Sequence, residues 1–236
     1  MTQLILAITV FLLTHLVPAL PRLRAGLVAA LGRRAYLVGY SVLSLAVLGW
    51  VGHSYAQAPY IPLWDYEPRM AWVPAVLMFP AVLLLVAGLL RPNPLSLSVR
   101  RGGFDPSRPG LLAVVRHPVP WAMALWAAAH MAANGDVAAW ILFGLLLVLS
   151  LAGMAGLDAK RRRDLGDREW RRLAAPTSAW PFAAWLTGRA RPRLHVPRLQ
   201  VTGGTVMVVV LGAALYRLLL ALHEPVIGVS PWPPLD

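Results

Sequence analysis

The amino-acid sequence predicts an all-α fold: a polytopic membrane helix bundle of about six transmembrane helices plus one amphipathic cytoplasmic helix. Three observations support this fold class. Of the 236 residues, 58% are hydrophobic and only 14% are charged, a more apolar composition than that of ordinary soluble domains. The apolar residues form runs of about 20, the length that crosses the hydrocarbon core as a helix. The charged residues gather in the segments between these runs.

Six apolar runs are the predicted membrane spans. They occupy residues 4–20, 35–53, 71–90, 118–133, 137–157 and 201–222. Only Asn134, Gly135 and Asp136 separate the fourth run from the fifth, so we expect a tight antiparallel hairpin there. Pro118 suits the first turn of the fourth helix, because that position needs no backbone N–H donor. The whole chain, residues 1–236, is predicted to form a single integral-membrane domain.

The segments outside the runs also carry signals. The first run lacks a basic region before it, so it is predicted to be a span and not a signal peptide. The stretch DAKRRRDLGDREWRRL, within the most basic segment at 158–198, is typical of an amphipathic helix on the membrane surface. The final HEPVIGVSPWPPLD is rich in proline and small apolar residues. We expect it to fold back over the end of the last span.

The distribution of basic residues predicts the orientation of the chain. Loops 21–34, 91–116 and 158–198 contain 20 of the 22 Lys and Arg residues. These are every second loop, as a chain with six spans requires. Because basic loops remain in the cytoplasm, both termini are predicted to lie on the opposite side of the membrane.

The net charge of +12 would indicate nucleic-acid binding in a soluble protein. Here the basic residues are separated from the apolar runs instead of being interleaved with aromatic residues along a groove. The predicted partner is therefore the lipid bilayer and not nucleic acid. The chain has no cysteine, which excludes a disulfide framework, a thiolate metal ligand and a thiol nucleophile.

Four of the six histidines lie in or at the edge of an apolar run: His15, His117, His130 and His223. Any one of them could simply bond a neighbouring group inside the bundle. Ring nitrogens are costly to place in hydrocarbon, however, and four together favour a cofactor site. Histidine binds haem iron axially, and a haem needs only one or two such ligands. Zinc is less favoured, because the chain has no His-Glu-x-x-His pattern and few carboxylates near its spans.

Small residues in the fourth run would leave a slot for a flat cofactor: Ala122, Ala124, Ala127, Ala128 and Ala129. Close helix packing is the alternative explanation for them. Haem propionates need cations at the edge of the bundle, and Arg116 and Arg217 are the candidates. No nucleophile–base–acid set and no glycine-rich phosphate loop is visible.

Several blocks of the sequence resemble the NnrU family of bacterial membrane proteins. They are THLVPALPRLRAGLVAALGRRAY, RHPVPWAMALWAAAHMAANGD, DAKRRRDLGDREWRRLAAPTSAWPFAA and HEPVIGVSP. The family is associated with denitrification and nitric oxide metabolism. The resemblance implies a multi-pass protein of the bacterial inner (cytoplasmic) membrane, in which the orientation predicted from the basic loops makes both termini periplasmic. It also allows a non-enzymatic role as a partner of the nitrite or nitric oxide reductase machinery.

The NnrU family is in turn similar to 15-cis-zeta-carotene isomerase, a membrane enzyme that uses haem b. The two haem ligands of the isomerase fall on His15 and His130 here. The resemblance thus implies haem b held by these histidines, and possible cis-trans isomerisation of a lipid-soluble substrate. The isomerase has a cysteine where this chain has Ala127, so a ligand switch through sulfur is not available. Depth along the helices alone would instead pair His15 with His117, and His130 with His223.

A second interpretation comes from the Arg-His-Pro corner, the later charged helix and the Pro-aromatic stop after it. These features also resemble isoprenylcysteine-type membrane methyltransferases. In that case Arg116, His117 and Asp158 would form a site for S-adenosylmethionine on the cytoplasmic face.

Overall fold

The computed structural model describes residues 1–236 except 17–19, 66, 101, 191–202 and 228–236. The described elements are α1 (Thr2–Leu16), α2 (Pro21–Leu31), α3 (Arg33–Ala56), the 3-10 helix η2 (Pro68–Ala71), α4 (Trp72–Leu90), α5 (Leu111–Val114), α6 (Pro118–Ala133), α7 (Val137–Leu165), α8 (Asp167–Ala174), α9 (Ala183–Leu186) and α10 (Gly203–Ile227). Among the described residues the extended structure is limited to one isolated bridge between Pro62 and Asp136. The predicted all-helical class is therefore confirmed.

Each predicted span contains a helix, but not every helix is long enough to cross a bilayer. Among the described residues, four helices have the necessary length and apolar composition: Arg33–Ala56, Arg69–Leu90, Val137–Leu165 and Gly204–Val226. A fifth span results if α1 and α2 form one bent span. With 16 residues, α6 is shorter than these four. The membrane character of the chain is thus supported, whereas the count of six spans is not confirmed.

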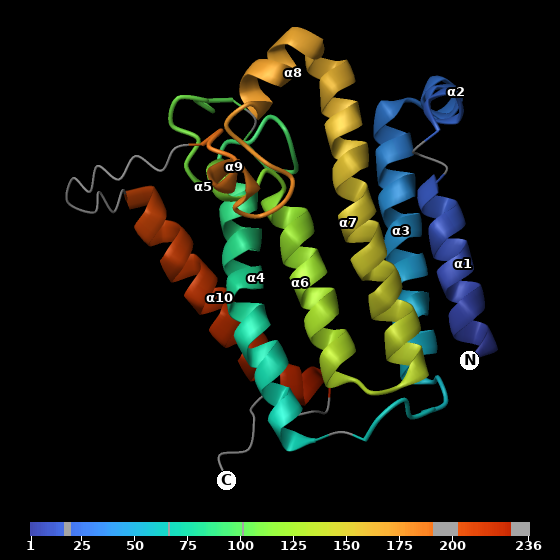
Figure 1. Ribbon diagram of the computed structural model, residues 1–236. Helices are drawn as coiled ribbons and strands as arrows, with labels where there is room; N and C mark the ends of the chain where they lie inside the picture. Colours follow the sequence, from blue (N-terminus) through green and yellow to red (C-terminus); the bar gives the residue numbers. More distant parts are fainter. Residues whose placement is uncertain (17–19, 66, 101, 191–202, 228–236) are drawn as a thin grey trace. The chain divides into compact units, whose positions relative to one another are not determined.

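The described helices group into two compact units. Unit 1 consists of Met1–Asp65 and Gly135–Leu142, and unit 2 of Tyr66–Asn134 and Phe143–Asp236. Within unit 1, α1 and α2 both pack against α3 (Figure 1). Within unit 2, α4 is the central helix and packs against both α6 and α10 (Figure 1). That the two units act as one domain stays a prediction.

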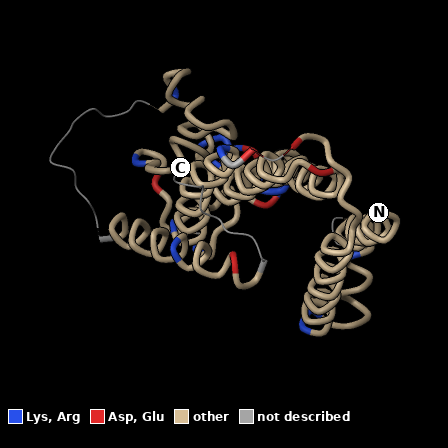
Figure 2. Tube along the Cα trace, turned by 90° about the horizontal axis from the view of Figure 1, so that it is seen from below, with Lys and Arg blue, Asp and Glu red and all other residues tan. Residues whose placement is uncertain are grey.

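The outer surfaces of the long helices are apolar. On α3 and α10 these exposed side chains include Val38, Val42, Leu45, Val206, Val209 and Val210. The helices are drawn almost entirely in tan in Figure 2, where charged residues would be blue or red. Large apolar faces of this kind suit contact with lipid tails, in agreement with a bilayer environment.

The turn between α6 and α7 is built by its polar residues. Asn134 ends α6, because its backbone and side-chain N–H groups both donate to the carbonyl of His130. Asp136 caps α7 by accepting a hydrogen bond from the backbone N–H of Ala139 at 3.1 Å. Between them, a Cβ on Gly135 would lie 2.6 Å from the carbonyl oxygen of Trp64, so only glycine fits. The predicted turn is therefore present where the sequence placed it.

The basic segment after the fifth span differs from the prediction. Residues 158–165 continue α7 and do not begin a separate surface helix. Gly166, with φ 78°, breaks the helix, and the short amphipathic α8 follows. Asp167 and Glu169 in the first turn of α8 complement the helix dipole, as do the arginines in its last turn. The predicted fold-back of the tail falls mostly on residues 228–236, outside the described residues.

The orientation of the chain can be tested with reporter fusions. Fusions after Arg34, Arg108 and Arg172 should report a cytoplasmic position, because basic loops resist translocation. Fusions after Glu67 and after Asp236 should report the opposite side. A cytoplasmic C-terminus would mean an odd number of spans and would contradict the predicted topology.

Close packing of α4 against α6 positions the start of α6. A Cβ on Gly88 of α4 would lie 2.8 Å from Val119 Cγ2 and 2.9 Å from Pro118 Cγ. Further along α6, the buried alanines are Ala122, Ala124, Ala127 and Ala129. Their burial agrees with close helix packing, the alternative explanation for these small side chains.

Replacing Gly88 with alanine should lower the melting temperature of the purified protein. The overlap with Val119 and the proline ring is expected to cost about 1–3 kcal/mol, more than the roughly 1 kcal/mol that alanine gains over glycine in a helix. Gly49 of α3 provides a matched control, because nothing lies within 4 Å of its added Cβ. Gly49→Ala should be neutral or stabilising. If both variants are stabilising, the proposed close contact between α4 and α6 is wrong.

Candidate functional site

A buried charged cluster lies at the start of α6 in unit 2. We call it the Arg116 cluster, and it consists of Ser96, Arg116, His117, Asp158 and Thr177. Arg116 is 7% exposed and His117 is fully buried. Pro118 begins α6 directly after these two residues, so the helix start holds both side chains in place. Asp158 comes from α7 and reaches the same point.

Asp158 lies between the two basic side chains. Its Oδ2 accepts a hydrogen bond from Arg116 Nη1 at 2.5 Å, and its Oδ1 lies 3.2 Å from His117 Nε2. The second contact has the distance of an ion pair without the alignment of a hydrogen bond. On the other side of the imidazole ring, His117 Nδ1 lies 2.9 Å from the hydroxyl of Ser96. One carboxylate therefore serves both consecutive residues of the Arg-His pair.

Backbone contacts hold the surrounding loops to the cluster. The Asn93 side chain donates to the carbonyl of Arg116 at 3.0 Å and accepts from the backbone N–H of Leu95. The backbone N–H of Arg116 donates to the carbonyl of Ser178 at 2.7 Å, and its Nε donates to the Thr177 hydroxyl at 2.8 Å. The cluster thus connects the proline-rich loop 91–116, the start of α6, α7 and the segment after α8.

The charges of Arg116 and Asp158 compensate each other inside the cluster. Burial lowers the pKa of Arg116, and the neighbouring Asp158 opposes this shift. A guanidinium remains protonated in proteins, so Arg116 and Asp158 form an ion pair. The guanidinium also lies over the ring of Trp170, with 5.3 Å from Cζ to the ring centroid. In the structure, the cluster links four chain segments at one junction.

His130 lies near the other end of α6, in a different environment. Its Nδ1 lies 2.8 Å from the carbonyl oxygen of Trp126, one turn earlier. The rings of Trp126 and Phe143 lie 5.0 and 4.9 Å from the imidazole, centroid to centroid. The side chain of His223 on α10 lies within electrostatic range of the His130 ring. The imidazole is half-buried among aromatic rings.

His15 repeats this arrangement in unit 1. Its Nδ1 lies 2.8 Å from the carbonyl oxygen of Phe11, again one helical turn earlier. The ring of Phe11 lies 4.1 Å away and that of Tyr40 on α3 lies 6.0 Å away, centroid to centroid. The two histidines singled out by the resemblance therefore share one local geometry, each within its own unit.

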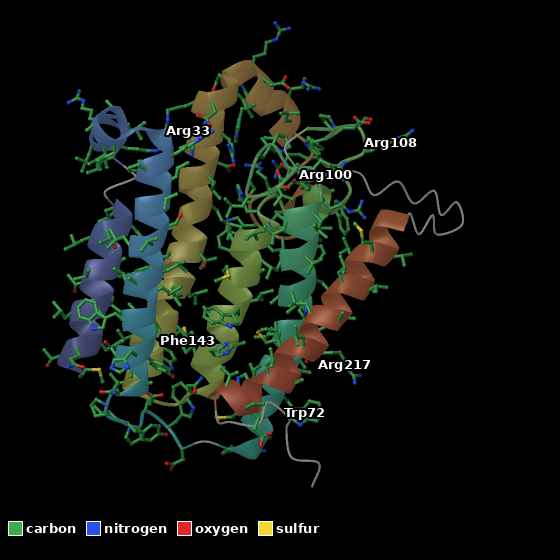
Figure 3. The ribbon with its side chains drawn as sticks, turned by 180° about the vertical axis from the view of Figure 1, so that it is seen from behind. Arg33, Trp72, Arg100, Arg108, Phe143 and Arg217 are labelled. Carbon is green, nitrogen blue, oxygen red and sulfur yellow. The ribbon has the colours of Figure 1, made fainter. Side chains whose placement is uncertain are left out.

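The other predicted site residues have distinct places. His117 belongs to the Arg116 cluster, where its two ring nitrogens face Ser96 and Asp158. Arg116 is engaged by Asp158 and lies roughly 20 Å along α6 from His130, too far to serve a propionate beside that histidine. Figure 3 places Arg217 on α10 toward the end of unit 2 that carries Trp72, away from Arg100 and Arg108.

Sequence reasoning missed several members of the charged cluster. The cluster members Ser96 and Thr177 lie 21 and 61 residues from their partners in the Arg-His pair, and no spacing rule connects them to it or to Trp170, whose ring lies beside the cluster. One feature of the sequence did indicate a buried ion pair. Asp158 directly follows the apolar run 137–157, where an unpaired charge would be costly.

No group of three or more His, Asp or Glu side chains that could hold a metal ion is present in the part of the chain that the structure describes. A haem needs at most two protein ligands, so the histidine geometry remains relevant to it. The model of the NnrU protein family matches residues 3–231, nearly the whole chain. No curated protein and no solved structure matches the chain.

Proposed function

The chain belongs to the NnrU family, and from this premise we propose that it is an integral membrane protein that binds one b-type haem through His130 and His15. The observation that supports the proposal is the shared geometry of the two imidazoles. In each, Nδ1 lies 2.8 Å from a carbonyl oxygen. Because a carbonyl can only accept, Nδ1 carries the proton and Nε2 keeps the lone pair that would bind iron.

Aromatic rings lie beside both histidines. Trp126 and Phe143 flank His130, and Phe11 and Tyr40 flank His15. These rings would shield the iron ligands from water, and Arg217 on α10 would supply a cation for a propionate. A bound haem would supply a redox-active iron able to bind nitric oxide, which agrees with the metabolism associated with the family. The choice of His15 rests on the resemblance and on this local geometry, and His223 is the alternative second ligand in unit 2.

We also propose where the protein lies and how a substrate would reach it. The protein would lie in the bacterial inner membrane with both termini periplasmic. Any substrate would be lipid-soluble and would enter sideways from the bilayer, with cis-trans isomerisation of a polyene as the reaction that the resemblance implies. A non-enzymatic role beside nitrite or nitric oxide reductase machinery would need the haem but no turnover.

One observation favours a second candidate function. The three residues predicted for the methyltransferase interpretation, Arg116, His117 and Asp158, come together at the start of α6. Asp158 is the most exposed of the three, with 22% of its side chain accessible. To bind S-adenosylmethionine there, these side chains would have to give up contacts that they already make with one another. We therefore rank this function below haem binding.

An absorbance spectrum distinguishes the two candidates. Full-length protein, produced with ample haem supply and purified in detergent, should show a Soret band and yield one b-type haem per chain on extraction. The same sample should not bind S-adenosylmethionine in a calorimetric titration. Tight binding of S-adenosylmethionine by a sample without Soret absorbance would reverse the order of the two candidates.

A further inference from the structure

A cavity of about 260 Å³ lies on the basic side of unit 2, apart from the histidines and from the Arg116 cluster. Its walls combine two arginines, Arg91 and Arg108, with apolar side chains that include Phe104, Leu111 and Leu112. We propose that this cavity binds the phosphate headgroup of an anionic phospholipid. The proposal does not depend on haem binding.

The position of Arg91 indicates how deep the cavity lies in the membrane. This residue directly follows α4, whose apolar span ends at Leu90. Its Nη2 donates to the hydroxyl of Thr205 at 3.0 Å, in the first turn of α10, where another apolar span begins. One arginine therefore bridges the ends of two adjacent candidate spans. Ends of apolar spans lie at the level of the lipid headgroups, so the guanidinium is at the depth of lipid phosphates.

The charge of the lining suits a monoanion. Arg91 and Arg108 contribute two positive charges, and Asp105 contributes one negative charge. The carboxylate of Asp105 is already engaged, because its Oδ1 accepts from the backbone N–H and the hydroxyl of Ser107. Arg91 retains further N–H donors beyond the one that binds Thr205. A phosphodiester can take these donors, as basic pockets between spans do with lipid headgroups.

The apolar part of the lining explains why a lipid is preferred over free phosphate. Leu112 is buried, Leu111 and Phe104 are half-buried, and Leu111 packs against the core between α4 and α10. Outside the cavity, α10 exposes Val206, Val209 and Val210. A glycerol backbone can lie on the leucines while the acyl chains follow the outer face of α10 into the bilayer.

The test uses the full-length protein in nanodiscs of phosphatidylcholine with a minor fraction of phosphatidylglycerol. Native mass spectrometry then measures the phosphatidylglycerol retained by each chain. Arg91→Gln and Arg108→Gln should each weaken retention about fivefold, the effect of removing one cation near a lipid phosphate. Arg108 is exposed on its loop, so its substitution leaves the core intact. Arg100→Gln is the matched control, because Arg100 is in the same loop and does not line the cavity.

Two results would overturn the proposal. The first is that Arg100→Gln weakens retention as much as the cavity variants, which would indicate general attraction to the basic surface. The second is that inorganic phosphate alone binds with the same dependence on Arg91 and Arg108 while phosphatidylglycerol is not retained, which would identify free phosphate as the ligand. Retention of phosphatidylglycerol that only the two cavity variants weaken, and that millimolar inorganic phosphate does not displace, supports the lipid.

Discussion

Replacing Asp158 with alanine is expected to destabilise the protein by about 3–5 kcal/mol, the usual effect of removing one partner of a buried ion pair. The side chain of Arg116 is 8% exposed and its guanidinium donates to Asp158. Without the carboxylate, the buried charge would keep only the hydroxyl and carbonyl of Thr177 and the ring of Trp170. His117 would lose the group facing its Nε2 at the same time.

Thermal unfolding of the detergent-solubilised protein measures this effect, and α7 supplies the control. Asp164 lies on the same helix and pairs with Arg161 at 3.6 Å, but half of its side chain is exposed. Asp164→Ala should therefore change stability by less than about 1 kcal/mol. Removing both charges of the buried pair, with Arg116→Met and Asp158→Leu together, should recover part of the loss. Equal effects of Asp158→Ala and Asp164→Ala would show that the Arg116 cluster does not stabilise the fold.

The second large effect concerns the proposed cofactor. His130→Ala and His15→Ala should each abolish haem binding or convert the haem to a high-spin form, because each variant removes one proposed axial ligand. His195→Ala should keep the wild-type spectrum, since His195 falls in the basic sequence segment 158–198, outside the apolar runs. Absorbance spectra and extracted haem per chain measure the outcome for every variant.

The same series distinguishes the two possible second ligands. Loss of the spectrum in His223→Ala, with His15→Ala unchanged, would mean that the pairing by helix depth was correct and the pairing by resemblance wrong. His117→Ala should lower stability through the Arg116 cluster and should leave the spectrum of the folded fraction unchanged. Folded yield must therefore be measured beside haem content.

The helices could be predicted from hydropathy, because an apolar run of about 20 residues has few alternatives to a membrane helix. Their ends were less predictable. The charged residues 158–165 continue α7 up to Gly166 and do not start a separate surface helix. Basic side chains are favourable in the last turn of a helix, so the sequence alone could not distinguish the two arrangements. Hydropathy also predicted six membrane spans. Among the described helices, α6 has only 16 residues and is too short to be identified as a span by itself.

The candidate site was predictable only in part. Arg116 and His117 could be identified from the sequence, because ionisable side chains are costly at the edge of an apolar span and Pro118 marks the start of a helix directly after them. Their partners Ser96 and Thr177 are ordinary loop residues, and only the folded chain brings them to the same point. The local geometry of His15 and His130 could not be read from the sequence either, because it depends on side-chain rotamers within each helix.

Chemical rescue tests the central claim most directly. The purified His130→Ala variant is mixed with added haem, and the absorbance spectrum is recorded before and after free imidazole is added. If His130 is a residue that would hold the iron, the variant should lack the wild-type spectrum, and imidazole should restore it by replacing the missing side chain. A His130→Ala variant that keeps the wild-type spectrum before imidazole is added, or wild-type protein without any Soret band, would contradict haem binding by His130.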